Sequence, residues 1–451
     1  MAKVPRLLIV SAFFPPSRKI GARRPERFAR RLAERGWDVT VLAPHARYGL
    51  PLDDDWTAPE GVRVLRTHAF VPGNAIRRTA DTLRRFVPSG AHAASSSQAA
   101  PTATAGTTVP SSPAKGRRGA IGSLRDAFWR TVASAEFPDR WRGWQPFALR
   151  AVRGQSFDVV MATLPPYTPA LIARRIAERT GAVYALDYRD PWTEAPRTDW
   201  DPALFAHLLD RHRQLEDSCL SAADVVFATS PTIGRWLAPR AGIEPVFAPN
   251  SFDHRDDAPR PRTKTIVYTG TLAYGRTLTP VLEAMAALKE DPAGRELSLV
   301  YAGTEGAQVV AEAARLGLTD RVRNLGYVPA KESDLLARDA LAAVVLVTPR
   351  YEYMLPGKLF EVVAASTPLL LIAPENADVA AICRAHRLGW DHRPEDIAGI
   401  IRSLKQALAG LVPTPSGIEM LTTDHVIGRV DGELRAALER GPRNPVTRRR
   451  S

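Results

Sequence analysis

Short apolar runs alternate with helical patterns along most of the chain, and this alternation constrains the fold more than any other feature. The run RLLIVSAFF (6–14) has the length of a strand and is apolar throughout, as expected of a strand covered on both faces. A helix is expected from about Ala22 to Glu34, because apolar residues recur there at helical spacing. The next predicted strand is WDVTVLAP (37–44). A strand, a helix and a strand in this order predict a parallel sheet.

Two series of such units follow one another. In the first series, strands are predicted at 62–67, 157–163, 182–188, 224–230 and 245–250, with helices at 168–180 and 202–222. In the second series, strands are predicted at 265–272, 297–303, 322–328, 342–349 and 367–374, with helices at 280–288, at 307–316 and after Pro356. The sequence therefore predicts an α/β fold with two doubly wound domains, whose ligands sit at the carboxyl ends of the strands and face a cleft between the domains.

The predicted domain boundaries follow changes in composition. An N-terminal Rossmann-like domain is expected over 1–250, with a flexible insertion at about 77–120, because residues 89–118 are rich in Ala, Ser, Thr and Pro and cannot bury enough apolar surface to order themselves. The polar run 251–264 is the predicted hinge, and 265–422 the C-terminal domain. Residues 423–451 are expected to form a helix, able to pack back on the N-terminal domain, and a basic tail.

The net charge of +13 comes from 61 basic and 48 acidic residues and is concentrated in two segments, 1–36 and 115–154. Such clusters favour an anionic partner, which could be nucleotide phosphates, an anionic membrane or nucleic acid. In the segment 137–154, arginines are interleaved with Trp141 and Trp144, a pattern that suits a membrane interface or lipid diphosphate as well as a packed helical hairpin. Without a secretory leader or a run of about 20 apolar residues, the expected location is cytoplasmic, with peripheral contact at the inner face of the plasma membrane as an option.

The common nucleotide-binding fingerprints are missing from the sequence. The first strand is not followed by GxGxxG, and GxxxxGK[ST] does not occur, which argues against a dehydrogenase and a P-loop NTPase. The two cysteines, Cys219 and Cys383, are far apart and form no metal-ligand pattern.

Six motifs instead carry a resemblance to one family. They are LLIVSAFFPPSRKIGARRPERFARRLAERGWDVTVLAP, ATLPPYTPALIARRIAERTGAVYALDYRDPWTE, FATSPTIGRWL, APNSFD, YTGTL and PGKLFEVVAASTPLLL. In this order they resemble glycosyltransferase family 4, and most closely its bacterial branch that builds surface and capsular polysaccharides. The resemblance covers most of the chain outside 70–120. It implies a GT-B fold, in which two Rossmann-like domains face a cleft, and transfer of a sugar from a nucleotide-sugar, by preference UDP-linked, to a glycan or lipid-linked acceptor. It also implies retention at the anomeric carbon, no cofactor and no obligatory metal.

Gly21 is the first candidate for contact with the donor. It lies at the start of the first predicted helix, where unpaired backbone N–H groups favour an anion. Because it has no side chain, it lets a diphosphate approach the backbone closely. An ordinary loop glycine is the alternative.

The segment PGKLFEVVAA supplies the next three donor candidates, Lys358, Leu359 and Glu361. Pro356 and Gly357 open a helix, and Lys358 adds a fixed positive charge for phosphate. Glu361 is the only charged residue within LFEVVAA, so a buried carboxylate that accepts strong hydrogen bonds is expected there, with a Glu on an exposed helix stripe as the alternative. In the family that the chain resembles, the matching Glu binds the nucleotide ribose. The usual first Glu of the family falls on Tyr353.

Two further segments complete the predicted site. In TGTLAYGR, Gly270 and Thr271 end a strand and Arg276 follows, where the family commonly places basic groups against the donor diphosphate. In ALDYRDPWTE, the RDxW pattern that the family recognises makes Asp190 the candidate catalytic residue, in contact with acceptor or sugar and able to act as a general base. Pairing of Asp190 with Arg189, or capping of a helix by Asp190, is the alternative. Arg189 and Trp192 are expected on the acceptor side.

Two other function classes are compatible with parts of the sequence. A GT-B-shaped epimerase would turn over a nucleotide-sugar without an acceptor. A nucleic-acid-binding protein would explain the charge, but it leaves the paired α/β series and the scarcity of stacking aromatics on basic strands unexplained, so no nucleic acid is expected as a partner.

Overall fold

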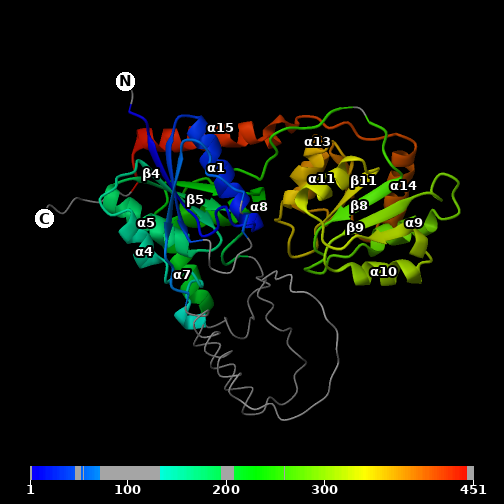
Figure 1. Cartoon of the computed structure of the whole chain (residues 1–451), viewed down its shortest axis with the longest axis horizontal. Helices are drawn as coiled ribbons and strands as arrows, with labels where there is room; N and C mark the ends of the chain where they lie inside the picture. Colours follow the sequence, from blue (N-terminus) through cyan, green and yellow to red (C-terminus); the bar gives the residue numbers. More distant parts are fainter. Residues whose placement is uncertain are drawn as a thin grey trace, which may run out of the picture. The chain divides into compact units, whose positions relative to one another are not determined.

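The structure is a computed structural model that describes residues 3–45, 52–53, 55–71, 133–194, 208–258 and 260–443. The predicted insertion at about 77–120, the start of the predicted helix 202–222 and the end of the basic tail lie outside these ranges. The chain divides into two compact units (Figure 1). The N-terminal unit comprises Met1–Phe227, Trp236–Val246 and Asp431–Ser451, and the C-terminal unit comprises Ala228–Arg235 and Phe247–Val430.

The first sheet has seven strands in the order β3-β2-β1-β4-β5-β6-β7. Its strands are β1 (Arg6–Val10), β2 (Asp38–Pro44), β3 (Val62–Thr67), β4 (Val159–Leu164), β5 (Val183–Tyr188), β6 (Val225–Ala228) and β7 (Val246–Phe247). The helices that accompany it are α1 (Arg23–Glu34), α4 (Gln145–Ala151), α5 (Thr168–Thr180), α7 (Leu209–Leu220) and α8 (Pro231–Ala241). The ladders that join β1 to β2 and β4, β2 to β3, and β4 to β5 are parallel.

The second sheet has six parallel strands in the order β10-β9-β8-β11-β12-β13. Its strands are β8 (Thr265–Thr269), β9 (Ser298–Ala302), β10 (Val322–Asn324), β11 (Ala342–Leu346), β12 (Leu369–Ile372) and β13 (Gly389–His392). Its helices are α9 (Thr279–Ala287), α10 (Gly306–Arg315), α11 (Ala330–Arg338), α12 (Gly357–Ala364), α13 (Asp378–His386) and α14 (Ile397–Leu408). The helix α15 (Thr423–Arg440) follows near the end of the described chain.

Residues of the second sheet alternate between two apolar cores. Ile266 of β8 packs in the core on one face, with residues of α9 and α14. Its neighbour Val267 packs in the core on the other face, with residues of α12 and α13. Because both faces are covered, the inner strands β11 and β12 are apolar throughout, and each fully buried aliphatic side chain contributes about 1.5–3 kcal/mol. This explains why continuous apolar runs marked the strands in the sequence.

Both sheets reverse their strand order at one point. The reversal lies between β1 and β4 in the first sheet and between β8 and β11 in the second. At such a switch point the loops after the two central strands run in opposite directions and leave a crevice at the carboxyl ends, where doubly wound proteins bind ligands. The prediction of an α/β fold with two Rossmann-like parallel sheets is confirmed.

The last part of the described chain packs on the N-terminal unit. Trp37, between α1 and β2, donates its indole N–H to Asp431 of α15 at 2.7 Å. Arg435 of the same helix donates to the carbonyl of Arg35 at 2.9 Å. Within the described ranges, no helix has the length and apolar character needed to cross a membrane.

Candidate functional site

The loops after β8 and β11 meet at the switch point of the C-terminal unit. The hydroxyl of Thr348, after β11, donates to the carbonyl of Tyr274, after β8, at 2.9 Å. The rings of Tyr274 and Tyr351 lie 5.3 Å apart. The predicted donor residues of this unit, Gly270, Thr271, Arg276, Lys358, Leu359 and Glu361, all lie in the loop after β8 or in α12, the helix that follows the β11 loop.

The turn at the end of β8 depends on two glycines. Gly270 has φ +138°, a conformation that side chains disfavour. A Cβ on Gly303, at the end of β9, would come within 2.1 Å of the Gly270 carbonyl oxygen. This carbonyl also lies 3.2 Å from the hydroxyl of Tyr301, and the Thr271 carbonyl accepts from Tyr268 at 3.1 Å. Hydrogen bonds from two tyrosine hydroxyls to backbone carbonyls therefore fix the start of the loop, and the Thr271 side chain is exposed.

Arg276 presents a buried donor that no group in the described chain accepts. Its guanidinium carbon lies 5.6 Å from the centre of the Tyr274 ring. Its Nε is buried and has no hydrogen-bond partner among the described residues. Burial raises the pKa of the neighbouring Tyr268 to about 12, and the positive charge of Arg276 opposes this rise. A buried donor without a partner is rare in native proteins, and an anionic ligand would satisfy it.

The start of α12 brings a helix terminus and a lysine together. The helix begins at Gly357, and its first backbone N–H groups have no partner within the helix. The Lys358 ammonium lies 3.2 Å from the hydroxyl of Ser333 and forms an ion pair with Glu361. Both charged side chains are accessible, at 28% and 32%. The prediction of a buried carboxylate at Glu361 is therefore wrong, because one turn of helix turns this position toward solvent. Leu359 is fully buried in the apolar core.

Arg189 joins the loops at the switch point of the N-terminal unit. Its guanidinium donates to the carbonyl of Gly21 at 2.8 Å and to that of Leu164 at 3.0 Å, and it also donates to Pro165. Gly21 lies in the loop after β1, Leu164 is the last residue of β4, and Pro165 follows it. A Cβ on Gly21 would lie 2.7 Å from the same guanidinium, so a larger residue here would displace the end of the Arg189 side chain. Burial lowers the pKa of Arg189.

Arg24 and Asp187 form a buried ion pair that the sequence did not reveal. The guanidinium of Arg24, in the first turn of α1, donates to both carboxylate oxygens of Asp187, with its shortest contact at 2.7 Å. The two residues are 163 positions apart. Their only sequence signal is that Arg24 stands at the start of the helix after β1 and Asp187 near the carboxyl end of β5.

The segment after β5 contains Asp190 and Trp192. Asp190 is half-buried and has polar partners of its own. The Trp192 indole is fully buried, stacks on Tyr167 at 4.2 Å, and donates to the ring of His212 at 3.0 Å. Trp192 was expected on the acceptor side, but a side chain with no exposed surface can act on a ligand only through its neighbours.

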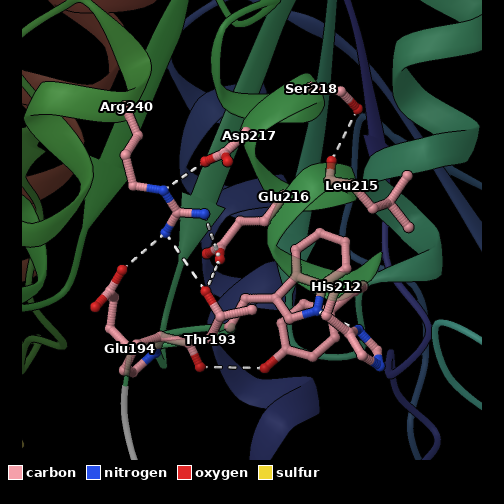
Figure 2. A network of polar contacts seen from close by, with 11 residues as sticks. Thr193, Glu194, His212, Leu215, Glu216, Asp217, Ser218 and Arg240 are labelled. Atoms are coloured by element: carbon pink, nitrogen blue, oxygen red, sulfur yellow. Dashed lines mark hydrogen bonds and ion pairs between the residues drawn. The ribbon is translucent and has the colours of Figure 1, made fainter. Parts of the chain in front are cut away.

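A polar network fixes the end of this segment (Figure 2). Arg240 of α8 donates to Glu194 at 3.1 Å, to Glu216 at 2.9 Å and to Asp217 at 2.6 Å. Thr193 donates to the same Glu216. Glu216 is completely buried, and burial raises its pKa, with the Arg240 charge opposing the rise. Three carboxylates thus converge on one guanidinium, which holds the chain just beyond Asp190.

Asp139 occupies the N-terminus of α5, beside the end of β4. Its carboxylate accepts from the backbone N–H of Tyr167 at 2.6 Å and of Thr168 at 2.7 Å, and from the hydroxyl of Thr168 at 2.8 Å. The N–H of Trp141 also donates to it at 2.8 Å. Because this helix terminus is already satisfied by an internal anion, it offers no place for a phosphate.

The tryptophans of the segment 137–154 lie in the core of the N-terminal unit. Trp141 and Trp144 are buried, and the indole of Trp144 donates to Thr67 at 2.6 Å. The sequence allowed either a membrane interface or a packed helical hairpin in this segment, and these two side chains are packed inside the unit.

The cavities that the structure contains lie away from the predicted site residues. Two cavities of about 450 and 190 Å³ lie beside the amino ends of β5 and β6, and none of the predicted site residues lines them. Among the residues that the structure describes, no group of three His, Cys, Asp or Glu is placed to hold a metal ion.

The second sheet and its helices match a known family model. Residues 263–409 match the model described as glycosyl transferases group 1. This range runs from β8 through α14 and contains every predicted donor residue except Gly21. No curated protein matches the sequence.

Solved structures resemble the chain over nearly its whole length. Sucrose-phosphate synthase from Thermosynechococcus elongatus is 14% identical, with a TM-score of 0.54 and 97% of each chain covered. The lipopolysaccharide outer core galactosyltransferase WaaB is 11% identical, with a TM-score of 0.52, covering 96% of this chain and 99% of that one. A putative UDP-N-acetylglucosamine 2-epimerase from Listeria monocytogenes is 12% identical, with a TM-score of 0.50, covering 98% and 99%.

At these identities the likeness shows the fold alone, which is the GT-B arrangement of two Rossmann-like sheets. The group 1 match over 263–409, on this fold, indicates that the protein is a glycosyltransferase.

Proposed function

We propose that the protein is a family 4 glycosyltransferase that moves a sugar from a nucleotide-sugar, UDP-linked by preference, to a glycan or lipid-linked acceptor, with retention at the anomeric carbon. Its setting would be cell-surface polysaccharide biosynthesis in the cytoplasm, with peripheral contact at the inner face of the plasma membrane. The observation that carries the donor side is the unsatisfied buried Nε of Arg276, in the loop after β8 at the switch point of the C-terminal unit. Lys358 adds a second positive charge at the start of α12.

The donor diphosphate would be held by three groups of the C-terminal unit. Arg276 would give its unpaired Nε–H, Lys358 its ammonium, and α12 the positive end of its helix dipole at Gly357. These groups are fixed before the sugar leaves, so they stabilise the negative charge that develops on the departing diphosphate. The backbone turn at Gly270 and Thr271 would let the diphosphate approach closely, and the buried Leu359 keeps the start of α12 in place.

Glu361 would accept hydrogen bonds from the nucleotide ribose. Its carboxylate is paired with Lys358 one turn earlier and remains accessible. A nucleotide-sugar that reaches both residues would place a phosphate against the Lys358 ammonium and two ribose hydroxyls against the Glu361 carboxylate. Both charges would then keep a partner when the ligand binds.

On the N-terminal unit, Asp190 would contact the acceptor or the transferred sugar and could accept the proton of the attacking hydroxyl. Arg189 and Trp192 would hold the segment around it, since one clamps the switch-point loops and the other is anchored in the core. Gly21 would lie near the phosphates of the nucleotide-sugar, while its carbonyl accepts a hydrogen bond from Arg189.

The experiment that tests the donor assignment compares Glu361→Gln with the wild type. A panel of nucleotide-sugars is first screened for a rise in melting temperature, because a ligand that binds only the folded state stabilises it. We expect Glu361→Gln to bind the selected nucleotide about tenfold or more weakly, because a ribose hydrogen bond to a charge is lost. Inorganic pyrophosphate, which has no ribose, should bind both proteins equally.

The control is Glu332→Gln, which removes an exposed carboxylate from α11. It should bind the nucleotide like the wild type. Wild-type affinity and turnover in Glu361→Gln would refute the ribose assignment. A GT-B-shaped epimerase would use the same donor site, and conversion of the donor without any acceptor would identify it.

A further inference from the structure

Two buried tyrosines stand side by side at the carboxyl end of the second sheet. Tyr268 of β8 and Tyr301 of β9 are paired across the two strands, and their rings stack with centres 5.9 Å apart. Burial raises the pKa of each hydroxyl to about 12, so both keep their proton at neutral pH. The Tyr268 hydroxyl donates to the Thr271 carbonyl at 3.1 Å, and the Tyr301 hydroxyl lies 3.2 Å from the Gly270 carbonyl.

Glu305 adds a third contact to the same loop. It is the last residue before α10, and its carboxylate accepts from the backbone N–H of Leu272 at 3.2 Å. Its own N–H donates to the Tyr301 hydroxyl at 3.2 Å, and its carboxylate lies 3.3 Å from that hydroxyl. Side chains thus hold three consecutive residues, 270–272, at the start of the loop after β8. We call Tyr268, Tyr301 and Glu305 the loop anchor.

The charge of Glu305 has the wrong sign for a phosphate site. Its carboxylate is half-buried and forms no ion pair with any residue that the structure describes. It lies close enough to the Tyr268 hydroxyl to raise the pKa of that group, while the charge of Arg276 lowers the same pKa. On charge alone, a carboxylate at this place weakens the binding of a diphosphate. Its hydrogen bond to the loop is the contribution of opposite sign.

The loop beyond the anchor follows a fixed path to Arg276. Tyr274 and Gly275 both have positive φ, +64° and +76°, and the N–H of Arg276 donates to the carbonyl of Ala273 at 3.3 Å. A bulky residue such as Tyr274 keeps a left-handed conformation only where its surroundings hold it. Here Thr348 donates to its carbonyl. A shift of residues 270–272 would therefore be passed through this short turn to the Arg276 side chain.

We propose that the loop anchor positions Arg276, so that its buried Nε–H meets the diphosphate of the donor, and that Glu305 is a positioning residue for donor binding in spite of its charge. This inference rests on the proposed function, because it assigns residues that act on the same donor site. Tyr268, Tyr301 and Glu305 act through the loop and through Arg276, without contact with the ligand.

The first test uses the sign of the Glu305 effect. UDP and inorganic pyrophosphate are titrated into the wild type, Glu305→Ala and Glu305→Gln. We expect Glu305→Ala to bind both ligands about tenfold more weakly, because the loss of the Leu272 contact displaces Arg276 and with it a charge-assisted hydrogen bond. Glu305→Gln should recover affinity to within about threefold of the wild type, because its carboxamide oxygen still accepts from Leu272.

Glu312→Ala is the matched control. It removes a carboxylate of α10 that pairs with Arg315 at 2.8 Å, and it should bind both ligands like the wild type. Charge alone predicts that Glu305→Ala and Glu305→Gln bind the two anions more tightly than the wild type. Tighter or unchanged binding by Glu305→Ala would overturn the proposal.

A double-mutant cycle tests whether the anchor acts through Arg276. Tyr301→Phe removes the hydroxyl and keeps the stacked ring. It should weaken UDP about fivefold in the wild type and less than about twofold in Arg276→Gln, because residues that act through one contact are not additive. The same loss in both backgrounds would show that Tyr301 does not position Arg276.

Amide hydrogen exchange without ligand separates this inference from the function on which it rests. The peptide 270–276 should exchange faster in Glu305→Ala than in Glu312→Ala, and equal exchange would refute the anchor itself. A wild type that binds UDP as tightly as both Glu305→Ala and Tyr301→Phe would refute the positioning role and leave the proposed function standing. A wild type that binds neither UDP nor pyrophosphate would refute the proposed function, and faster exchange in Glu305→Ala would then reduce the anchor to a support of the loop.

Discussion

At the scale of single residues, the ion pair of Arg24 and Asp187 joins α1 to β5 with three hydrogen bonds, and both side chains are buried. Asp187→Asn keeps the shape of the side chain but leaves the guanidinium of Arg24 as a buried charge without its counter-ion. Breaking one half of such a pair costs about 3–5 kcal/mol. We expect a loss of this size in the free energy of unfolding of the N-terminal unit.

The measurement is urea unfolding followed by tryptophan fluorescence, because Trp390 is the only tryptophan outside the N-terminal unit. Lys3→Gln serves as the control, since it breaks the exposed ion pair with Asp158. Exposed pairs contribute about 1 kcal/mol or less. A loss in Asp187→Asn that is no larger than in Lys3→Gln would show that the pair does not hold α1 to the sheet.

At the scale of elements, α7 and α8 hold the end of the segment after β5 through Glu216 and Arg240 (Figure 2). Burial raises the pKa of Glu216 above its usual value. The folded state therefore keeps this proton more tightly than the unfolded chain, where Glu titrates at about 4.3. The stability that the protonated group contributes is complete below that pH and is lost as pH rises through the raised pKa.

Glu216→Gln removes this titration. We expect the melting temperature of the wild type, minus that of the variant, to fall as pH is raised from 4 to 8. Glu312→Gln is a control of opposite sign, because a hydrogen bond from Arg315 lowers the pKa of Glu312 and its contribution is lost as pH falls. If the wild-type and Glu216→Gln melting temperatures change in parallel with pH, Glu216 does not titrate as its burial implies.

Elements built from local pattern could be predicted from the sequence. The strand at 62–67 and the helix at 168–180 have the predicted bounds, because their apolar periodicity and flanking turns are local signals. The strand predicted at 265–272 ends earlier, at Thr269, since the apolar run continues into the loop at the switch point. The edge strand β13 was not predicted as a separate element, because its residues GWDH are only half-buried and form no apolar run.

The site could be predicted only in part, for a physical reason. Lys358 and Glu361 stand in one helical motif, so their proximity follows from spacing of three residues. The contacts of Arg189 with Gly21, of Arg240 with Glu216 and of Asp139 with α5 join segments far apart in the chain. Such pairs depend on the order of strands in the sheet, which the local pattern does not specify.

At the scale of the whole molecule, the two sheets have the same order of strands around the switch point, but the residues that lie there differ between the two units. In the C-terminal unit the switch point carries Arg276, Lys358 and the N-terminus of α12. In the N-terminal unit the terminus of α5 is filled by Asp139, and Arg189 donates to the backbone carbonyls of the loops. This difference assigns the nucleotide to the C-terminal unit and the acceptor to the N-terminal unit in our proposal.

The central claim, that the carboxyl edge of the second sheet binds the nucleotide of a sugar donor, is tested most directly by titrating UDP into the wild type, Lys358→Gln and Lys331→Gln. Lys331 is an exposed lysine of α11 and controls for the change in net charge. The account predicts that UDP binds the wild type and Lys331→Gln alike, and Lys358→Gln about 10–100-fold more weakly, because a charge-assisted contact with phosphate is lost. Equal affinity for UDP in all three proteins would contradict it.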